Sequence, residues 1–200
     1  MRDVNGAAAG DGSGTGGAGD GLDVGGAGGD GLAEPGDGRS RTVAPLLVIA
    51  VGNPSRGDDA LGPALLDRLR DAHVERAGDV ELLLDFQLQV EHALDLAGRR
   101  AVLFVDASRE AALAGTVSLA RIEADAGTPG TSHALSAPAV LGIARRIGSA
   151  PPPSWQMAIG GRAFGLGEPL SGAGSAGLER GVEAALGWLR ARRTETRADA

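Results

Sequence analysis

Short runs of apolar residues alternate with helix-like stripes along most of the chain. The run Leu46–Val51 has the length and composition of a strand that is buried on both faces, as in a parallel sheet. Further strands are predicted over residues 80–85, 101–106, 116–121 and 155–160. Helical spacing of apolar residues lies between them, in stretches that begin near residues 60, 90, 136 and 178. This alternation predicts an α/β fold, with a mostly parallel sheet that helices flank on both faces.

The two ends of the chain differ from its middle. Residues 1–44 are mostly Gly, Ala, Asp and Ser with scattered single aliphatics, too few to offset the entropy cost of ordering, so we expect a disordered leader. Residues 45–193 carry the strand and helix patterns and form the predicted folded domain. Residues 194–200 are expected to be a frayed tail.

Composition narrows the classes of function. With 200 residues and 42% hydrophobic content, the chain is long enough for one domain with a core. A net charge of −7 argues against nucleic acid and membrane surfaces as partners. The lack of cysteine excludes thiolate metal ligands and a cysteine nucleophile. The sequence has neither an apolar run of membrane-spanning length nor a signal-like start, so we expect a cytoplasmic protein.

Acids follow three of the predicted strands. Asp58 and Asp59 come after the first strand, while Asp85 and Asp106 end the second and third. Parallel strands present their C-terminal ends at one edge, where ligand crevices form, so these acids should lie together. Either Asp58 or Asp59 can cap a helix that starts near Ala60. A second adjacent carboxylate is repelled by the first unless solvent, a cation or a substrate group offsets the repulsion.

One of the three histidines is a candidate ligand. His73 lies among charged neighbours and His92 lies next to Glu91, so both are expected to be solvated, whereas His133 lies in a polar loop before a predicted helix. With Asp59 and Asp106, His133 would complete a set of two carboxylates and an imidazole, which suits a divalent ion such as nickel or zinc. The chain has neither the Gly-x-Ser-x-Gly elbow of α/β-hydrolases nor the Gly-x-Gly-x-x-Gly turn of dinucleotide-binding proteins.

Several motifs, in order, resemble those of the hydrogenase maturation proteases, which trim the large subunits of nickel–iron hydrogenases. An apolar strand, Gly-Asn-Pro and then paired acids occupy residues 47–62. Similar segments follow as Phe86-Gln-Leu-Gln-Val-Glu91, Phe104-Val-Asp-Ala107, Ser132-His-Ala-Leu-Ser136 and the stretch 159–171. Ala60 departs from the family pattern, in which glycine is usual, and the leader is not part of that pattern.

The resemblance implies a twisted five-stranded sheet between helices, a three-layer α/β/α arrangement. It also implies that Asp59, Asp106 and His133 recognise nickel, that Asp85 lies beside the cleft and is linked to cleavage, and that all four form the active site. The nickel would belong to the partner, a large-subunit precursor that loses its C-terminal extension, so no tightly held cofactor is expected. The chemistry of the cut is left open: the substrate-held metal could polarise the carbonyl, or an acid such as Asp85 or Asp58 could act as general base on water.

Two other classes of function fit the sequence less closely. One is a checkpoint or chaperone protein that binds the nickel-loaded precursor without cutting it. The other is a small-molecule hydrolase or nucleotide-binding enzyme built on a similar sheet. A bound but uncut precursor would identify the first, and a saturable small ligand would identify the second.

Overall fold

The central sheet has five strands, four of them parallel. The computed structural model describes residues 43–125 and 135–198, with side chains described as far as residue 195. Within them the strand order is β2-β1-β3-β5-β4. Only β4 runs antiparallel, against β5 at one edge of the sheet. The strands are β1 (Leu46–Val51), β2 (Val80–Asp85), β3 (Ala101–Ser108), β4 (Val117–Ile122) and β5 (Ser154–Gly160).

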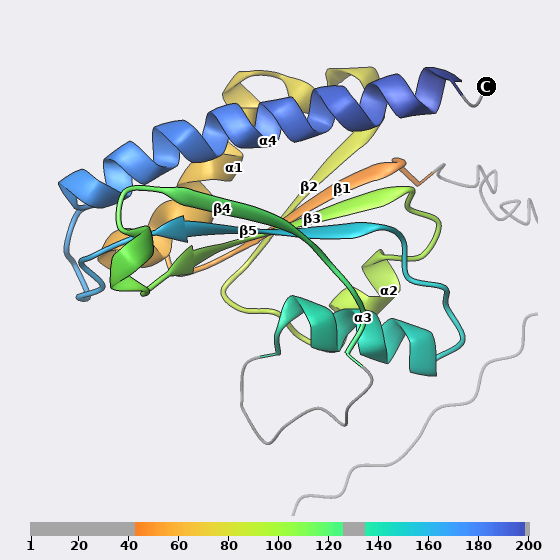
Figure 1. Ribbon diagram of the computed structural model, residues 1–200, viewed down its shortest axis with the longest axis horizontal. Helices are drawn as coiled ribbons and strands as arrows, with labels where there is room; N and C mark the ends of the chain where they lie inside the picture. Colours follow the sequence, from red (N-terminus) through yellow and green to blue (C-terminus); the bar gives the residue numbers. More distant parts are fainter. Residues whose placement is uncertain (1–42, 126–134, 199–200) are drawn as a thin grey trace, which may run out of the picture. The chain divides into compact units, whose positions relative to one another are not determined.

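Helices cover both faces of this sheet, as Figure 1 shows. The long helices α1 (Leu61–Asp71) and α4 (Gly172–Ala198) lie on one face. The shorter α2 (His92–Asp95) and α3 (Ala137–Arg146) lie on the other. Single turns of 3-10 helix also join the described elements: η1 (Gly57–Ala60), η2 (Val74–Ala77) and η3 (Ala111–Leu113). The predicted three-layer α/β/α fold is therefore confirmed.

The buried core forms two layers, one on each side of the sheet. Successive side chains of a strand point to opposite faces, so Leu46, Val48 and Ala50 face the layer under α1 and α4. Leu47, Ile49 and Val51 face the layer under α2 and α3. All six residues of β1 are buried, which explains why its sequence is an unbroken apolar run. None of the helices in the described part of the chain is long and apolar enough to cross a membrane.

Helix α4 is longer than the sequence pattern predicted. We expected a glycine-rich loop as far as Gly177 and fraying after Arg193, but the helix begins at Gly172 and continues to Ala198. Its first turn is capped by Ser171, whose hydroxyl accepts a hydrogen bond from Gly174 N–H at 2.9 Å. Residues 1–42 lie outside the described residues, so the predicted leader stays a prediction.

Candidate active site

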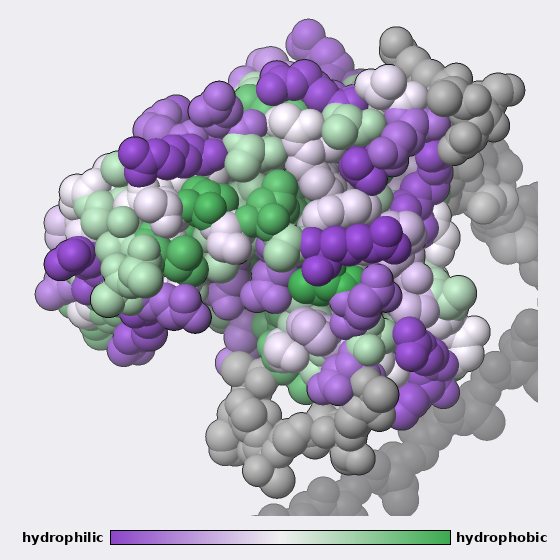
Figure 2. Space-filling model, in the orientation of Figure 1, coloured by the Kyte–Doolittle hydropathy of each residue, from purple (hydrophilic) through white to green (hydrophobic). Residues whose placement is uncertain are grey.

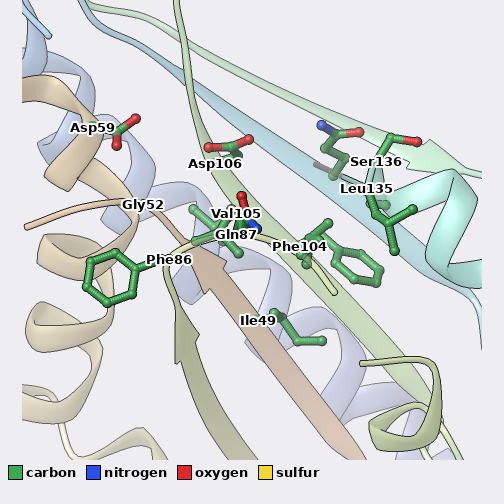
Figure 3. Close-up of a pocket in the computed structure, with 14 residues that line it drawn as sticks. Ile49, Gly52, Asp59, Phe86, Gln87, Phe104, Val105, Asp106, Leu135 and Ser136 are labelled. Atoms are coloured by element: carbon green, nitrogen blue, oxygen red, sulfur yellow. The ribbon is translucent and has the colours of Figure 1, made fainter. Parts of the chain in front are cut away.

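A pocket of about 390 Å³ opens at the edge of the sheet where β1 and β3 end. The chain passes from β1 to β2 on one side, while β3 lies on the other side of β1, so this is the point at which strand order reverses. Ligands of open α/β sheets bind at such points. Figure 3 shows the carboxylates of Asp59 and Asp106 at one end of the pocket, with Phe86, Phe104 and Leu135 among its apolar walls.

Asp59 reaches the pocket because the turn after β1 is very tight. Gly52 ends the strand region with φ of 141°, and a Cβ there would collide with the Asp59 backbone carbonyl. Only glycine fits this close approach. The Asp59 carboxylate accepts a hydrogen bond from Asn53 N–H at 3.1 Å, which holds its side chain beside the turn. The Gly-Asn-Pro motif thus presents this acid to the pocket.

Asp106, near the end of β3, has a pKa well above that of an ordinary aspartate. Protein atoms crowd its carboxylate even though solvent still reaches the residue in the open cleft. This desolvation raises its pKa from 3.8 to about 6, against a hydrogen bond from Ala107 N–H that lowers it, and the charge of Asp59 adds to the rise. Two carboxylates that repel each other across a pocket are typical of a site for a cation.

Asp58 does not cap the helix, contrary to the expectation for this acid pair. Neither η1 nor α1 has a side-chain cap. Asp58 is fully buried and accepts hydrogen bonds from Arg162 N–H (2.6 Å), Ala163 N–H (3.0 Å), Ser171 N–H (2.7 Å) and Ser171 O–H (2.6 Å). Burial alone would raise its pKa, but these bonds hold the pKa below the ordinary 3.8. Asp58 therefore anchors the loop between β5 and α4.

Asp85 ends β2 beside the pocket rather than inside it. The residues that line the pocket wall are the next three, Phe86, Gln87 and Leu88. The Asp85 carboxylate accepts hydrogen bonds from Phe86 N–H at 2.6 Å and from the Gln89 side-chain amide at 3.2 Å. These local bonds fix its orientation at the start of the wall.

His92 is buried, so the expectation that it is solvated was wrong. Only 4% of its surface is exposed, and its Nδ1 accepts a hydrogen bond from Gln89 N–H at 2.8 Å. A neutral imidazole that accepts at Nδ1 carries its proton on Nε2. That Nε2 lies 3.5 Å from Asp85 Oδ2. The expectation failed because a histidine next to Glu91 on a short predicted helix looks exposed from the sequence.

The structure brings together two of the four predicted site residues and places a third beside them. Asp59 and Asp106 share the pocket, and Asp85 lies at its rim. His133 lies outside the described residues, although Leu135 and Ser136, just after it, line the pocket. Among residues 43–125 and 135–198, no group of three or more His, Asp or Glu side chains is arranged to hold a metal ion.

Comparison with known proteins gave matches among solved structures only. Neither a family model nor a curated protein matches the chain. The [NiFe] hydrogenase maturation protease HycI from Thermococcus kodakarensis is 25% identical with a TM-score of 0.55, over 74% of this chain and 93% of that one. The hydrogenase maturating endopeptidase HybD from E. coli is 24% identical with a TM-score of 0.58, over the same shares, 74% and 93%.

A third structure, the hydrogenase 2 maturation peptidase from a Thaumarchaeota archaeon, is 23% identical with a TM-score of 0.53 and covers 72% of this chain and 97% of that one. All three alignments span nearly the whole of the compared protein. The resemblance drawn from the sequence motifs is thereby confirmed in three dimensions. The chain is therefore similar to solved structures that are hydrogenase maturation proteases, a class of peptide hydrolase.

Proposed function

We propose that this protein is a cytoplasmic endopeptidase that removes the C-terminal extension of a nickel-loaded hydrogenase large-subunit precursor. The observation that carries the proposal is the pair Asp59 and Asp106, which line one end of the pocket, Asp59 from the turn after β1 and Asp106 from the neighbouring parallel strand β3. The similar solved structures are named as hydrogenase maturation proteases, which supports a hydrogenase precursor as the substrate.

Nickel enters this proposal as part of the substrate. Carboxylate oxygens of Asp59 and Asp106, with an imidazole nitrogen of His133, form a donor set that suits a divalent first-row ion. A ligand must lose its proton to bind, and the raised pKa of Asp106 means that this proton leaves only near pH 6. A cation in the pocket would offset the repulsion between the two carboxylates. The site is thus poised for a metal that arrives with the precursor.

Of the two acids considered as the base for water, we assign the role to Asp85. Asp58 is fully buried, and its carboxylate already accepts four hydrogen bonds, so no water can reach a free lone pair. Asp85 keeps 28% of its side chain exposed at the rim of the pocket. In this proposal the His92 Nε2 faces Asp85 and orients its carboxylate.

The test is the intact mass of a purified large-subunit precursor before and after incubation with this protein, with and without nickel. We expect a discrete C-terminal peptide to be lost only from the nickel-loaded precursor. Asp106→Ala and Asp59→Asn should abolish the mass change while leaving the circular dichroism spectrum unaltered. Asp71→Asn, on the exposed end of α1, is the matched control and should cut like the native protein.

Three outcomes would contradict the proposal in different ways. Cleavage by Asp106→Ala at the native rate would remove the metal-recognition role. A stable complex with an uncut precursor would indicate a checkpoint protein instead. A protein that ignores every hydrogenase precursor of its host but saturates with a small ligand would be an enzyme of another class.

A further inference from the structure

We infer that a cleft lined by Arg109 and Arg162, with Arg56 beside it, binds a carboxylate of the peptide segment that follows the scissile bond. The cleft is a second cavity, of about 400 Å³, between the end of β3 and the loop after β5. Gly161, Ala111 and Phe164 complete its walls. The inference rests on the proposed endopeptidase function and names the part of the substrate that this cleft would take.

Phe164 contacts two of these arginines, Arg109 and Arg56. The Arg109 guanidinium lies over the Phe164 ring, 4.2 Å from the ring centroid. Arg56 Nε donates a hydrogen bond to the Phe164 backbone carbonyl at 3.2 Å. Stacking on an aromatic face restrains a guanidinium while leaving its N–H groups free for an acceptor. The cleft therefore holds pre-oriented donors rather than freely moving surface arginines.

These arginines are not neutralised by the part of the protein that the structure describes. Within residues 43–125 and 135–198, no carboxylate forms an ion pair with Arg56, Arg109 or Arg162. The acid on the same loop, Glu168, instead accepts a hydrogen bond from Gly165 N–H at 3.0 Å. A cluster of like charges repels itself unless an anion offsets it. In a chain of net charge −7, three such arginines together indicate a site for an anionic group.

The loop after β5, which carries one wall of the cleft, is held in place by buried hydrogen bonds. Arg162 N–H and Ala163 N–H both donate to the buried carboxylate of Asp58, so the backbone on either side of the Arg162 side chain cannot shift freely. Figure 1 shows this loop beyond the tip of β5, and Figure 2 shows hydrophilic groups beside apolar ones at that end of the sheet. A pre-organised site loses less entropy when a ligand binds.

The distance to the paired acids suits a short peptide. Arg109 follows Asp106 by three residues, so their Cα atoms are at most about 11 Å apart. A peptide bond held near Asp106 would place a group about three residues further along at the arginines. A carboxylate at that point of the removed segment, from an acidic side chain or from the chain end, would therefore lie within reach of the arginines. Arginine binds carboxylates through two parallel hydrogen bonds, which makes this group the fitting ligand.

The first experiment measures binding without cleavage. The full chain, labelled with ¹⁵N, is titrated with the acetylated tripeptide Ala-Ala-Glu and with its neutral Ala-Ala-Gln amide. We expect the acid peptide alone to shift the side-chain signals of Arg109 and Arg162 and the backbone signals of residues 161–165. In the double variant Arg109→Ala/Arg162→Ala, the backbone shifts should be lost. The control is Arg76→Ala, which removes the positive charge of an exposed arginine on η2, and this variant should bind the acid peptide normally. Equal shifts with the neutral peptide, or tighter binding of inorganic phosphate, would overturn the inference.

The second experiment separates this inference from the proposed function. Cleavage of a nickel-loaded precursor is compared with that of one whose tail carries Asn and Gln for its acids and a terminal amide. The double variant should raise KM about fivefold for the native tail, with kcat unchanged, and have no effect on the neutral tail. If the double variant cleaves the native tail with the same KM as the native protein, the proposed role of the cleft is overturned and the proposed function still stands. If the native protein cuts nothing but binds the acid peptide, the function fails and the cleft stands.

Discussion

Asparagine in place of Asp58 would keep the shape of the side chain and remove its charge. The carboxylate sits on a fully buried residue and accepts four hydrogen bonds, three of them on Oδ2 and one on Oδ1. An amide offers one oxygen and one NH₂ group. If the oxygen takes the position of Oδ2, the NH₂ group faces Ser171 N–H, and two donors are left against each other.

The magnitude follows from those contacts. A hydrogen bond to a charged group contributes about 1.5–3 kcal/mol, and a buried donor without a partner costs about 1–3 kcal/mol. Local relaxation recovers part of this loss, so we expect Asp58→Asn to lower the free energy of unfolding by about 2–4 kcal/mol. That is a large share of the stability of an ordinary domain.

The assay is urea unfolding followed by tryptophan fluorescence. Both tryptophans of the chain, Trp155 and Trp188, pack edge to face at 5.7 Å between β5 and α4, the two elements that the loop anchored by Asp58 joins. Asp71→Asn, on the exposed end of α1, serves as the control and should change the unfolding free energy by less than about 0.5 kcal/mol. A loss below about 1 kcal/mol in Asp58→Asn would refute the view that this acid anchors the loop.

The pH dependence gives an independent check of the same reasoning. The folded-state pKa of Asp58 is lower than its ordinary 3.8, so the unfolded chain takes up the proton first as the pH falls. The stabilisation is therefore complete above about pH 4 and is lost as the pH falls through the folded-state pKa. The stability difference between the native protein and Asp58→Asn should shrink below pH 3.8.

Three further predictions concern the site itself. The Asp106 carboxyl should titrate near pH 6 by NMR, so its contribution to stability falls as the pH rises from about 4 to 6. Asp59→Asn should lower this pKa. A midpoint near 3.8 in the native protein would contradict the desolvation of this carboxylate. Gly52→Ala should destabilise the fold by more than about 1 kcal/mol in urea unfolding, because its Cβ meets the Asp59 carbonyl at a φ of 141°; a neutral result would show that the turn relaxes. His92→Phe should cost about 1–3 kcal/mol, since Gln89 N–H loses its acceptor, and a stability equal to the native value would mean that this bond is dispensable.

Local sequence was sufficient to predict the strands and the acids that follow them. The run Leu46–Val51 is apolar because both faces of β1 are covered, and that burial is visible in the sequence itself. The positions of Asp59 and Asp106 at one pocket then follow from the parallel direction of β1 and β3. Fold class and the paired acids were therefore predictable from short stretches alone.

Features that depend on distant partners were not predictable in this way. The role of Asp58 arises from donors 104 to 113 residues further along the chain. The early start of α4 has the same origin, since glycine-rich sequence has low helix propensity but Ser171 caps the helix and is itself held by Asp58. His92 is buried, with its Nδ1 bound to Gln89 N–H from the segment after β2, which spacing on a four-residue helix could not reveal.

The two layers of the core are covered by helices of unequal length, and this difference affects where the protein opens locally. The layer under α1 and α4 is held by helices of 11 and 27 residues, whereas α2 and α3, over the other layer, have 4 and 10. Amide hydrogens exchange fastest where a local opening exposes the least buried surface. The thinner layer also forms the pocket wall through Leu88 and Ala137. We expect transient opening of this wall, with the sheet intact, to be the motion that would admit a large substrate to the pocket.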